Sequence, residues 1–209
     1  MITPVNPYVA GNPVRGEKFF GRRDILEWVT QELHNSGTSA LVLFGQRRVG
    51  KTTLLLQLQN FLPRDRFHPV FFDLQYQTRR SLGEVLDDLA ESMADSIQME
   101  QPKEKTDNRG KYFQRKFLPS FLAKLDQGIR LVFLFDEFDV LEDIPNSPSE
   151  ESAAHNFFPF LRLLMADFPS IAFVFIAGRN PEDLSLDFSA TFKASLVKEI
   201  WVLDPDSAH

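Results

Sequence analysis

The stretch GQRRVGKT, from Gly45 to Thr52, decides the fold of this chain. It matches the pattern G-x-x-x-x-G-K-[ST], in which every fixed position has a physical task. The two glycines, Gly45 and Gly50, let the backbone wrap so that consecutive N–H groups point at phosphate oxygens. The helix that begins near Lys51 adds the positive end of its dipole. The Lys51 ammonium reaches the β- and γ-phosphates and the Thr52 hydroxyl binds Mg²⁺, so the stretch predicts a site for ATP or ADP with Mg²⁺.

The flanking residues favour this interpretation over a glycine turn that matches the pattern by accident. An apolar run, Leu41–Phe44, precedes the loop, and apolar residues then repeat at helical spacing from Lys51 to Leu62. A buried strand, a glycine loop and a helix therefore follow one another, as a phosphate-binding loop requires. The residues expected to contact the nucleotide here are Gly45, Gln46, Arg47, Arg48, Val49, Gly50, Lys51, Thr52 and Thr53.

The rest of the chain predicts an α/β domain with a parallel sheet. Short apolar runs that end in polar residues alternate with helical patterns, and this alternation is typical of a parallel sheet covered on both faces. We expect strands at 41–44, 69–74, 131–135, 171–177 and 199–203, and helices at 24–33, 51–62, 82–97, 113–125 (interrupted at Pro119) and 153–167. The polar segment 98–111 is expected to be an exposed loop or a mobile insertion.

A second motif, LVFLFDE from Leu131 to Glu137, places two carboxylates after an apolar strand. Ligands of open parallel sheets bind at the carboxyl ends of the strands, so these groups face the same crevice as the glycine loop. We expect Asp136 to hold Mg²⁺, directly or through water, and Glu137 to orient and deprotonate the attacking water. The alternative is a solvated acidic turn, which the nearby Asp139, Glu142 and Asp143 would suit.

A third element, Phe175–Asn180, is another apolar strand that ends in polar groups. If this strand lies beside the strand of the glycine loop, Arg179 or Asn180 can reach the γ-phosphate or the attacking water. An arginine there would report the nucleotide state and stabilise transferred charge. The alternative is a solvated arginine after a glycine turn. The candidate catalytic residues are therefore Glu137, Lys51 and Arg179.

Composition excludes several other classes of site. The chain has 209 residues, no cysteine, 43% hydrophobic residues and a net charge of −6. Disulfides and cysteine-based sites are excluded, the four histidines lack zinc-ligand spacing, and the net charge argues against whole-surface attraction to nucleic acid. The apolar runs are too short to span a bilayer, so we expect no membrane association and a cytoplasmic location.

In these motifs the chain resembles the STAND and AAA+ group of P-loop ATPases, and especially the prokaryotic STAND-type ATP-binding proteins. The resemblance rests on the glutamate after Asp136, on FFGR at 19–22, on the run Gln46–Arg48, and on Gly178-Arg179. It implies a three-layer P-loop NTPase fold of the additional-strand type, with a five-stranded parallel sheet in the order 5-1-4-3-2. It covers nearly the whole chain, from about Asn6 to Leu203, so we expect a single ATPase core domain over 1–209.

The resemblance also implies a second set of nucleotide contacts, from an N-terminal arm at 1–20 and the motif that follows it. These residues, placed near the adenine and ribose, are Pro7, Tyr8, Phe20, Gly21 and Arg22. For Phe19 and Phe20 the alternative is a hydrophobic staple packed on the next helix. The family motif continues with an acidic residue after the arginine, whereas here Arg23 precedes Asp24.

Relatives in this group follow the fifth strand with a helical lid, whereas this sequence ends at His209. We expect a fragment of a longer protein and name no arginine carried by a lid. The expected function is an ATP-binding, slowly hydrolysing switch in a STAND-type signalling or defence protein. Its partners would be effector or sensor domains outside this chain, with nucleotide-dependent self-association as an option.

Two other hypotheses remain open. One is a DNA-associated AAA+ ATPase, a loader or transposition helper, since Arg109, Lys111, Arg115 and Lys116 form a basic cluster that could touch phosphates. That cluster is more often a solvated helix face. The other is a small-molecule phosphotransferase, although Glu137 beside Asp136 suits activated water better than a metabolite hydroxyl.

Overall fold

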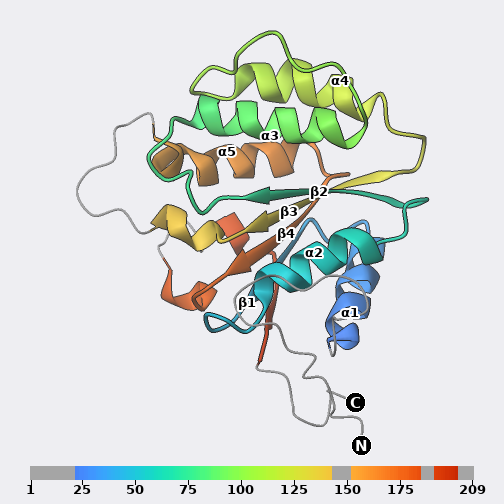
Figure 1. The fold of residues 1–209 in the computed structure, drawn as a ribbon, viewed down its shortest axis with the longest axis vertical. Coiled ribbons are helices and arrows are strands. Elements are labelled where there is room, and N and C mark those ends of the chain that lie inside the picture. The colour runs from blue at the N-terminus through green and yellow to red at the C-terminus, as the bar shows by residue number, and fades with distance from the viewer. Residues whose placement is uncertain (1–21, 143–151, 185–190, 202–209) are drawn as a thin grey trace, which may run out of the picture.

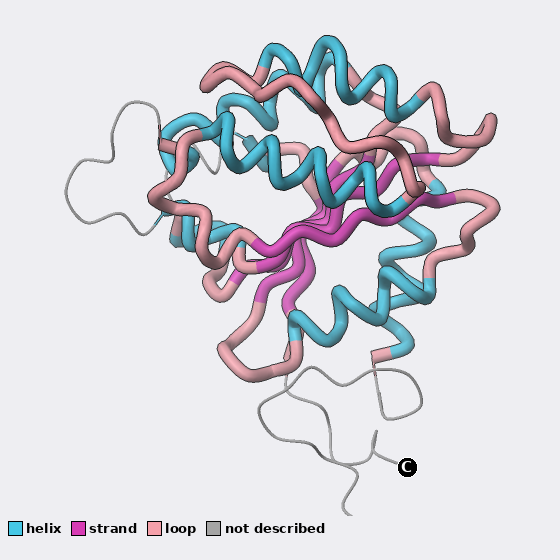
Figure 2. Tube along the Cα trace, turned by 45° about the horizontal axis from the view of Figure 1, so that its top comes forward, coloured by secondary structure: helices cyan, strands magenta, loops and turns pink. Residues whose placement is uncertain are grey.

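The structure is a computed structural model and describes residues 22–142, 152–184 and 191–201. A five-stranded parallel sheet lies between two layers of helices (Figure 1, Figure 2). Its strands are β1 (Ala40–Phe44), β2 (Phe67–Asp73), β3 (Arg130–Asp136), β4 (Ala172–Ala177) and β5 (Leu196–Glu199). The observed order is β2-β3-β4-β1-β5, which confirms the predicted three-layer fold and the predicted strand order.

In the described part of the chain, five α-helices and several shorter helical segments accompany the sheet. The α-helices are α1 (Arg23–His34), α2 (Lys51–Phe61), α3 (Leu82–Ser96), α4 (Leu118–Leu122) and α5 (Ala153–Asp167). The short turns are η2 (Phe113–Phe117), η3 (Phe138–Glu142) and η4 (Pro181–Asp183). Helices α1 and α2 lie on one face, and α3, α4 and α5 on the other (Figure 1). The chain is helical without a break through Pro119, so the predicted interruption is instead a change of helix type, where the π-helix η2 runs into α4.

The core divides along the sheet because alternate strand residues point to opposite faces. On the α1–α2 side, Leu41 and Leu43 pack with Leu54, Leu55 and other apolar helix residues. The opposite side is dominated by phenylalanine, and the stacked rings of neighbouring β3 and β4 belong to Phe133, Phe135, Phe173 and Phe175. Both faces of the central strands are therefore dry, which explains their near-continuous apolar sequences.

The prediction for the fifth strand was wrong in its bounds. The strand was expected at 199–203, but β5 spans Leu196–Glu199 and pairs with β1 alone. As an edge strand it leaves Leu196 and Val197 exposed, at 40% and 48%, so burial does not mark its position in the sequence. The apolar run begins at Ile200, where the strand has ended and the chain packs against the glycine loop.

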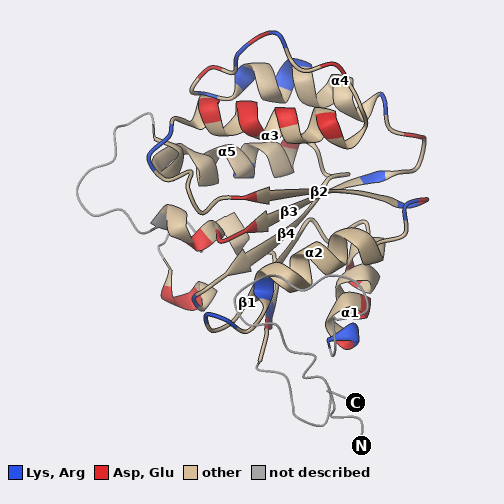
Figure 3. Cartoon of the chain, viewed as in Figure 1, with Lys and Arg blue, Asp and Glu red and all other residues tan. Residues whose placement is uncertain are grey.

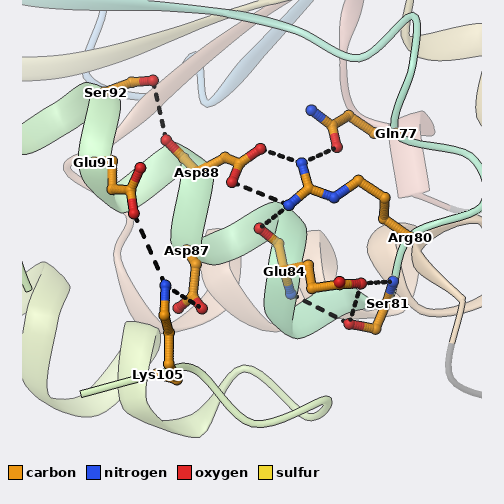
Figure 4. Close-up of polar contacts among 9 residues, drawn as sticks. All are labelled: Gln77, Arg80, Ser81, Glu84, Asp87, Asp88, Glu91, Ser92 and Lys105. Atoms are coloured by element: carbon orange, nitrogen blue, oxygen red, sulfur yellow. Dashed lines mark hydrogen bonds and ion pairs between the residues drawn. The ribbon is translucent and has the colours of Figure 1, made fainter. Parts of the chain in front are cut away.

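The polar segment 98–111 is mostly exposed, as expected, but side chains of α3 hold it in place. The Thr106 N–H donates to Asp87 Oδ1 at 2.8 Å, and Lys105 forms an ion pair with Asp87 at 3.4 Å. Figure 4 shows this pair beside the capping box of α3, in which Ser81 and Glu84 bond each other reciprocally.

Across the residues that the structure describes, no helix has both the length and the apolar character needed to cross a bilayer.

One side chain joins the end of α1 and two loops at the amino end of the sheet. Arg130 donates to the carbonyls of Leu33, Asn35, Thr38 and Ser170, at 2.6, 3.2, 2.7 and 3.0 Å. These carbonyls belong to the end of α1, to the connection between α1 and β1, and to the loop before β4. A guanidinium offers five N–H donors in a fixed fork, and this arrangement uses four of them.

We predict that Arg130→Ala lowers the free energy of unfolding by about 2–3 kcal/mol, because four carbonyls lose a charged donor. Arg130→Lys should recover only part of this, since an ammonium cannot span all four acceptors. Urea unfolding followed by circular dichroism measures both variants. An Arg130→Ala protein as stable as the wild type would show that these bonds contribute nothing net.

Candidate functional site

The glycine loop connects the end of β1 to the start of α2 through close backbone contacts. The Gly45 N–H donates to the Ala177 carbonyl of β4 at 3.3 Å. A Cβ on Gly45 would lie 2.4 Å from the carbonyl oxygen of Ile200, so this position has no room for a side chain. Gly50 precedes the first turn of α2 with a φ of 84°, in the left-handed region that favours glycine. Both glycines of the motif are therefore required by the backbone.

The Lys51 side chain folds back over this loop. Its Nζ donates to the carbonyls of Gly45 and Gln46, at 3.0 and 2.9 Å, and the residue is buried. Burial lowers the pKa of Lys51, while the negative charges of Glu137, Asp139 and Asp136 act to raise it. The lysine of the loop and the carboxylates of the second motif therefore lie close enough for their charges to interact.

Asp136 ends β3 at the same edge of the sheet. It is 1% exposed, and a hydrogen bond from the Thr52 side chain reaches it from the first turn of α2. Burial raises the pKa of Asp136 from 3.8 to about 6; the bond from Thr52 opposes this, and Glu137 and Asp73 add to it. The two predicted Mg²⁺ ligands, Thr52 and Asp136, are therefore in direct contact.

Glu137 stands next in the chain, in an unusual backbone conformation. Its φ is 49°, and its N–H donates to Asp136 Oδ1 at 3.0 Å. A non-glycine residue in the left-handed region costs free energy and is most often found where function requires it. Burial, then the charge of Asp139, raises the pKa of Glu137, against the opposing charges of Lys51 and Arg47. A half-buried carboxylate with a raised pKa suits a general base.

Arg179 follows β4, the strand that lies between β1 and β3. Its guanidinium is held by Asp139 of η3, since Nη2 donates to the Asp139 carbonyl at 2.8 Å and Nε approaches Oδ2 at 3.4 Å. Because β4 pairs with β1, Arg179 follows the strand next to that of the glycine loop, and its contacts with Asp139 distinguish it from a merely solvated arginine. Its role toward the γ-phosphate stays a prediction.

Two acidic residues at this edge were missed as site residues. Asp139 was read as part of an acidic turn, yet it is 6% exposed and anchors the loop after β4. Asp73 ends β2 in register with Asp136 and acts on the pKa values of Asp136 and Glu137. Asp73 had a usable signal in the sequence, because its strand ends in an aspartate just as β3 does.

Arg22 joins the glycine loop to the end of the sheet. Its Nη2 donates to the carbonyl of Val49 and, at 2.9 Å, to that of Trp201. The residue is 8% exposed, and its Nη1 has no hydrogen-bond partner among the residues that the structure describes. Arg22 therefore contacts the glycine loop, and its implied place near the adenine and ribose stays a prediction. The other adenine-site candidates, Pro7, Tyr8, Phe20 and Gly21, lie outside the described residues.

The remaining loop residues differ in exposure. Gln46, Arg47 and Arg48 are exposed and Val49 and Thr53 are half-buried. Arg48 has a φ of 66°, so the loop holds a second residue in the left-handed region besides Gly50. These exposed cations would lie beside the phosphates that the loop is predicted to bind.

The residues present fit a nucleotide with Mg²⁺. A buried carboxylate with a raised pKa lacks full charge compensation, and a divalent cation bound to Asp136 and Thr52 would supply it. The glycine loop, the start of α2 and Lys51 form a concentration of donors suited to phosphate oxygens. The buried Nη1 of Arg22 is a further donor near this loop.

Comparison with known proteins identifies the family of the chain. A family model described as an AAA domain matches residues 31–184, which is most of the chain. The chain belongs to the AAA domain family. The predicted membership in the AAA+ group of P-loop ATPases is confirmed, whereas the STAND subgroup stays a prediction. No curated protein matches the sequence of this AAA domain.

Solved structures resemble the AAA domain in fold. The ORC2 protein of Aeropyrum pernix, in ADPNP and ADP complexes, matches with a TM-score of 0.52, 12% identity and 86% of this chain covered. The E. coli MS115-1 HORMA:CdnC:Trip13 complex matches at 0.57, with 15% identity and 90% covered. AMPPCP-bound DnaA from Aquifex aeolicus matches at 0.51, with 18% identity and 91% covered. The matches cover 48%, 65% and 50% of those chains.

The raised pKa of Asp136 has a consequence for stability. Because the folded state binds the proton more tightly than an unfolded chain with a pKa of 3.8, this group stabilises the fold below pH 4. That contribution is lost as the pH rises through about 6. Above pH 7 the ionised, buried Asp136 therefore costs about 2–3 kcal/mol in the absence of a bound cation.

We predict that Asp136→Asn raises the free energy of unfolding at pH 7.5 by about 1–3 kcal/mol, because an amide can keep the Thr52 bond without a buried charge. The difference from wild type should shrink towards zero at pH 4. Urea titrations in EDTA at pH 4 and 7.5 measure it, with the exposed Asp126→Asn as control. A pH-independent difference, or a loss of stability at pH 7.5, would contradict the assignment.

Proposed function

We propose that this AAA domain binds ATP with Mg²⁺ and hydrolyses it slowly, as the switch module of a STAND-type signalling or defence protein. The observation that carries the proposal is the meeting of Lys51, Asp136 and Glu137 at one edge of the sheet, where each acts on the pKa of another. A cation from the glycine loop and two carboxylates from the end of β3, which β4 separates from β1, would form the site that hydrolysis of a γ-phosphate needs.

Binding falls to the glycine loop and the start of α2. Backbone N–H groups of the loop and the Lys51 ammonium would hold the β- and γ-phosphates. The Thr52 hydroxyl and the Asp136 carboxylate, already joined by a hydrogen bond, would hold Mg²⁺. When bound, Mg²⁺ neutralises charge that develops on the phosphate oxygens.

Hydrolysis requires a base and a counter-charge. Glu137 would accept the proton of the attacking water, and its raised pKa makes it a stronger base than an exposed glutamate. Arg179, next to the glycine loop, would stabilise negative charge on the transferred phosphoryl group. An arginine finger supplied by a partner raises the rate about 10³–10⁵-fold in related enzymes. We therefore propose slow turnover for the chain on its own, without such a partner.

The switch assignment rests on the loops that surround the nucleotide. Arg22 donates to the Val49 carbonyl of the glycine loop, and Arg179, after β4, donates to the Asp139 carbonyl. A bound γ-phosphate would compete with these carbonyls for the arginine donors. The sequence pairs Gly21 with Arg22 and Gly178 with Arg179, the pattern that suggested the STAND subgroup. We propose a single ATPase core over 1–209, with effector or sensor domains as its partners.

A matched pair of variants tests the proposal. Glu137→Gln should keep ATP affinity within about twofold while hydrolysis falls by at least about a hundredfold, because only the base is removed. Lys51→Ala should lose binding itself, since the phosphates lose their cation. Calorimetry with ATP and Mg²⁺ and release of inorganic phosphate measure the two properties.

Unchanged affinity in Lys51→Ala would contradict the assignment of the loop, and an active Glu137→Gln would remove Glu137 as the base. ATP consumption that requires an added small acceptor would instead indicate a phosphotransferase.

The likeness to ORC2 and DnaA favours, at the level of fold, a second candidate: a DNA-associated AAA+ ATPase. The basic cluster of that hypothesis lies on and just before η2, and acidic residues are dense on the nearby helix α3 (Figure 3). Lys116 is engaged by Glu104 at 3.0 Å, whereas Arg109, Lys111 and Arg115 are exposed. This mixed charge makes DNA the less favoured partner.

We predict that the wild-type protein shows no more than weak, sequence-independent DNA binding at physiological salt. Fluorescence anisotropy with a duplex at several salt concentrations measures it. Salt-dependent binding that disappears when Arg109, Lys111, Arg115 and Lys116 are all neutralised would make the DNA-associated function the better proposal.

A further inference from the structure

Asp139 is an almost fully buried acid that links two segments 40 residues apart in the chain. We infer that Asp139 is a positioning residue, which sets the place of Arg179 at the nucleotide site without itself touching the substrate. The inference rests on the proposed function, because Arg179 has a task there only if ATP is hydrolysed.

Asp139 uses three oxygens to hold the end of β4. Its Oδ1 accepts the Gly178 N–H at 3.0 Å, its Oδ2 lies 3.4 Å from Arg179 Nε, and its carbonyl accepts Arg179 Nη2 at 2.8 Å. One residue therefore fixes both the backbone before the arginine and two nitrogens of the guanidinium. Because the Arg179 side chain is 40% exposed, these bonds rather than dense packing limit the positions that it can take.

The neighbouring glycine makes this contact possible. A Cβ on Gly178 would lie 3.3 Å from Asp139 Oδ2, which is closer than such contacts usually are. The absence of a side chain at Gly178 thus lets the carboxylate approach the backbone of the arginine loop. This gives a physical reason for a glycine directly before Arg179.

The same anchor is tied to the catalytic edge. Asp139 lies two residues after Glu137, and its charge acts on both Lys51 and Glu137. At the other end, Ala177 accepts a hydrogen bond from Gly45, so the residue before Gly178 contacts the glycine loop. A side chain that connects these two segments is placed to set the distance between Arg179 and the phosphates.

A purely structural role is the competing explanation, in which Asp139 only closes η3 against β4. Loss of a structural contact would lower stability and ATP affinity together. Loss of a positioning contact would instead lower the turnover number while leaving affinity nearly unchanged, and its effect would depend on Arg179.

The experiment compares Asp139→Asn, Arg179→Ala and the double variant by phosphate release and by calorimetry with ATP and Mg²⁺. An asparagine keeps an oxygen for the Gly178 N–H and leaves the backbone carbonyl that binds Nη2, but it loses the negative charge beside Nε. We expect Asp139→Asn to lower kcat about tenfold with the ATP Kd within about twofold, as for a lost charge interaction in the transition state. In the Arg179→Ala background the same change should alter kcat by less than about twofold.

Asp88→Asn is the matched control, because it breaks another aspartate–arginine ion pair, between Asp88 of α3 and Arg80, which includes none of the proposed site residues (Figure 4). It should leave kcat and Kd unchanged. Thermal unfolding of each variant checks that the fold is kept.

An unchanged or raised kcat in Asp139→Asn would overturn the inference, and so would an equal loss in the Arg179→Ala background. A parallel loss of affinity and stability would show a structural role instead. A wild-type protein that does not hydrolyse ATP contradicts the proposed function and this role with it. An active wild type with an unaffected Asp139→Asn contradicts only the role of Asp139.

Discussion

The close approach of three backbone segments at Gly45 is the constraint on which the rest of the site depends. Gly45 donates to Ala177 of β4 on one side, and on the other a Cβ would meet the carbonyl of Ile200 at 2.4 Å. The Ile200 N–H in turn donates to Phe44 at 2.6 Å. Only a glycine lets β1 turn into the phosphate loop while neighbouring strands continue beside it. The strand order and the geometry of the glycine loop therefore depend on each other.

Electrostatics at this edge explains why the site costs stability. Asp136 is buried with Asp73 and Glu137 nearby, and burial raises its pKa to about 6. The Lys51 ammonium offsets part of this negative charge, but it donates hydrogen bonds to the carbonyls of Gly45 and Gln46 rather than to the carboxylates. Glu137 and Arg48 add backbone strain, because both have a positive φ in the left-handed region that non-glycine residues seldom adopt. Such an arrangement is expected where charge and strain serve a ligand rather than the fold.

Much of this was predictable from the sequence because the decisive patterns are local. The glycine loop, the strand that ends in Asp136 and Glu137, and the helical repeats are each readable within a few residues. The edge strand β5 was misplaced because its residues are exposed and follow no burial pattern. Asp139 was missed because its importance comes from a contact with Gly178 and Arg179, and only the fold brings that contact about.

Titration of the unmodified protein with ATP, followed by calorimetry in Mg²⁺ and again in EDTA, tests the central claim most directly. If the edge formed by Gly45–Thr52 and Asp136 is a nucleotide–metal site, one ATP binds per chain, at least about tenfold more tightly with Mg²⁺ than without it. No binding, or an affinity that does not depend on Mg²⁺, would contradict the account.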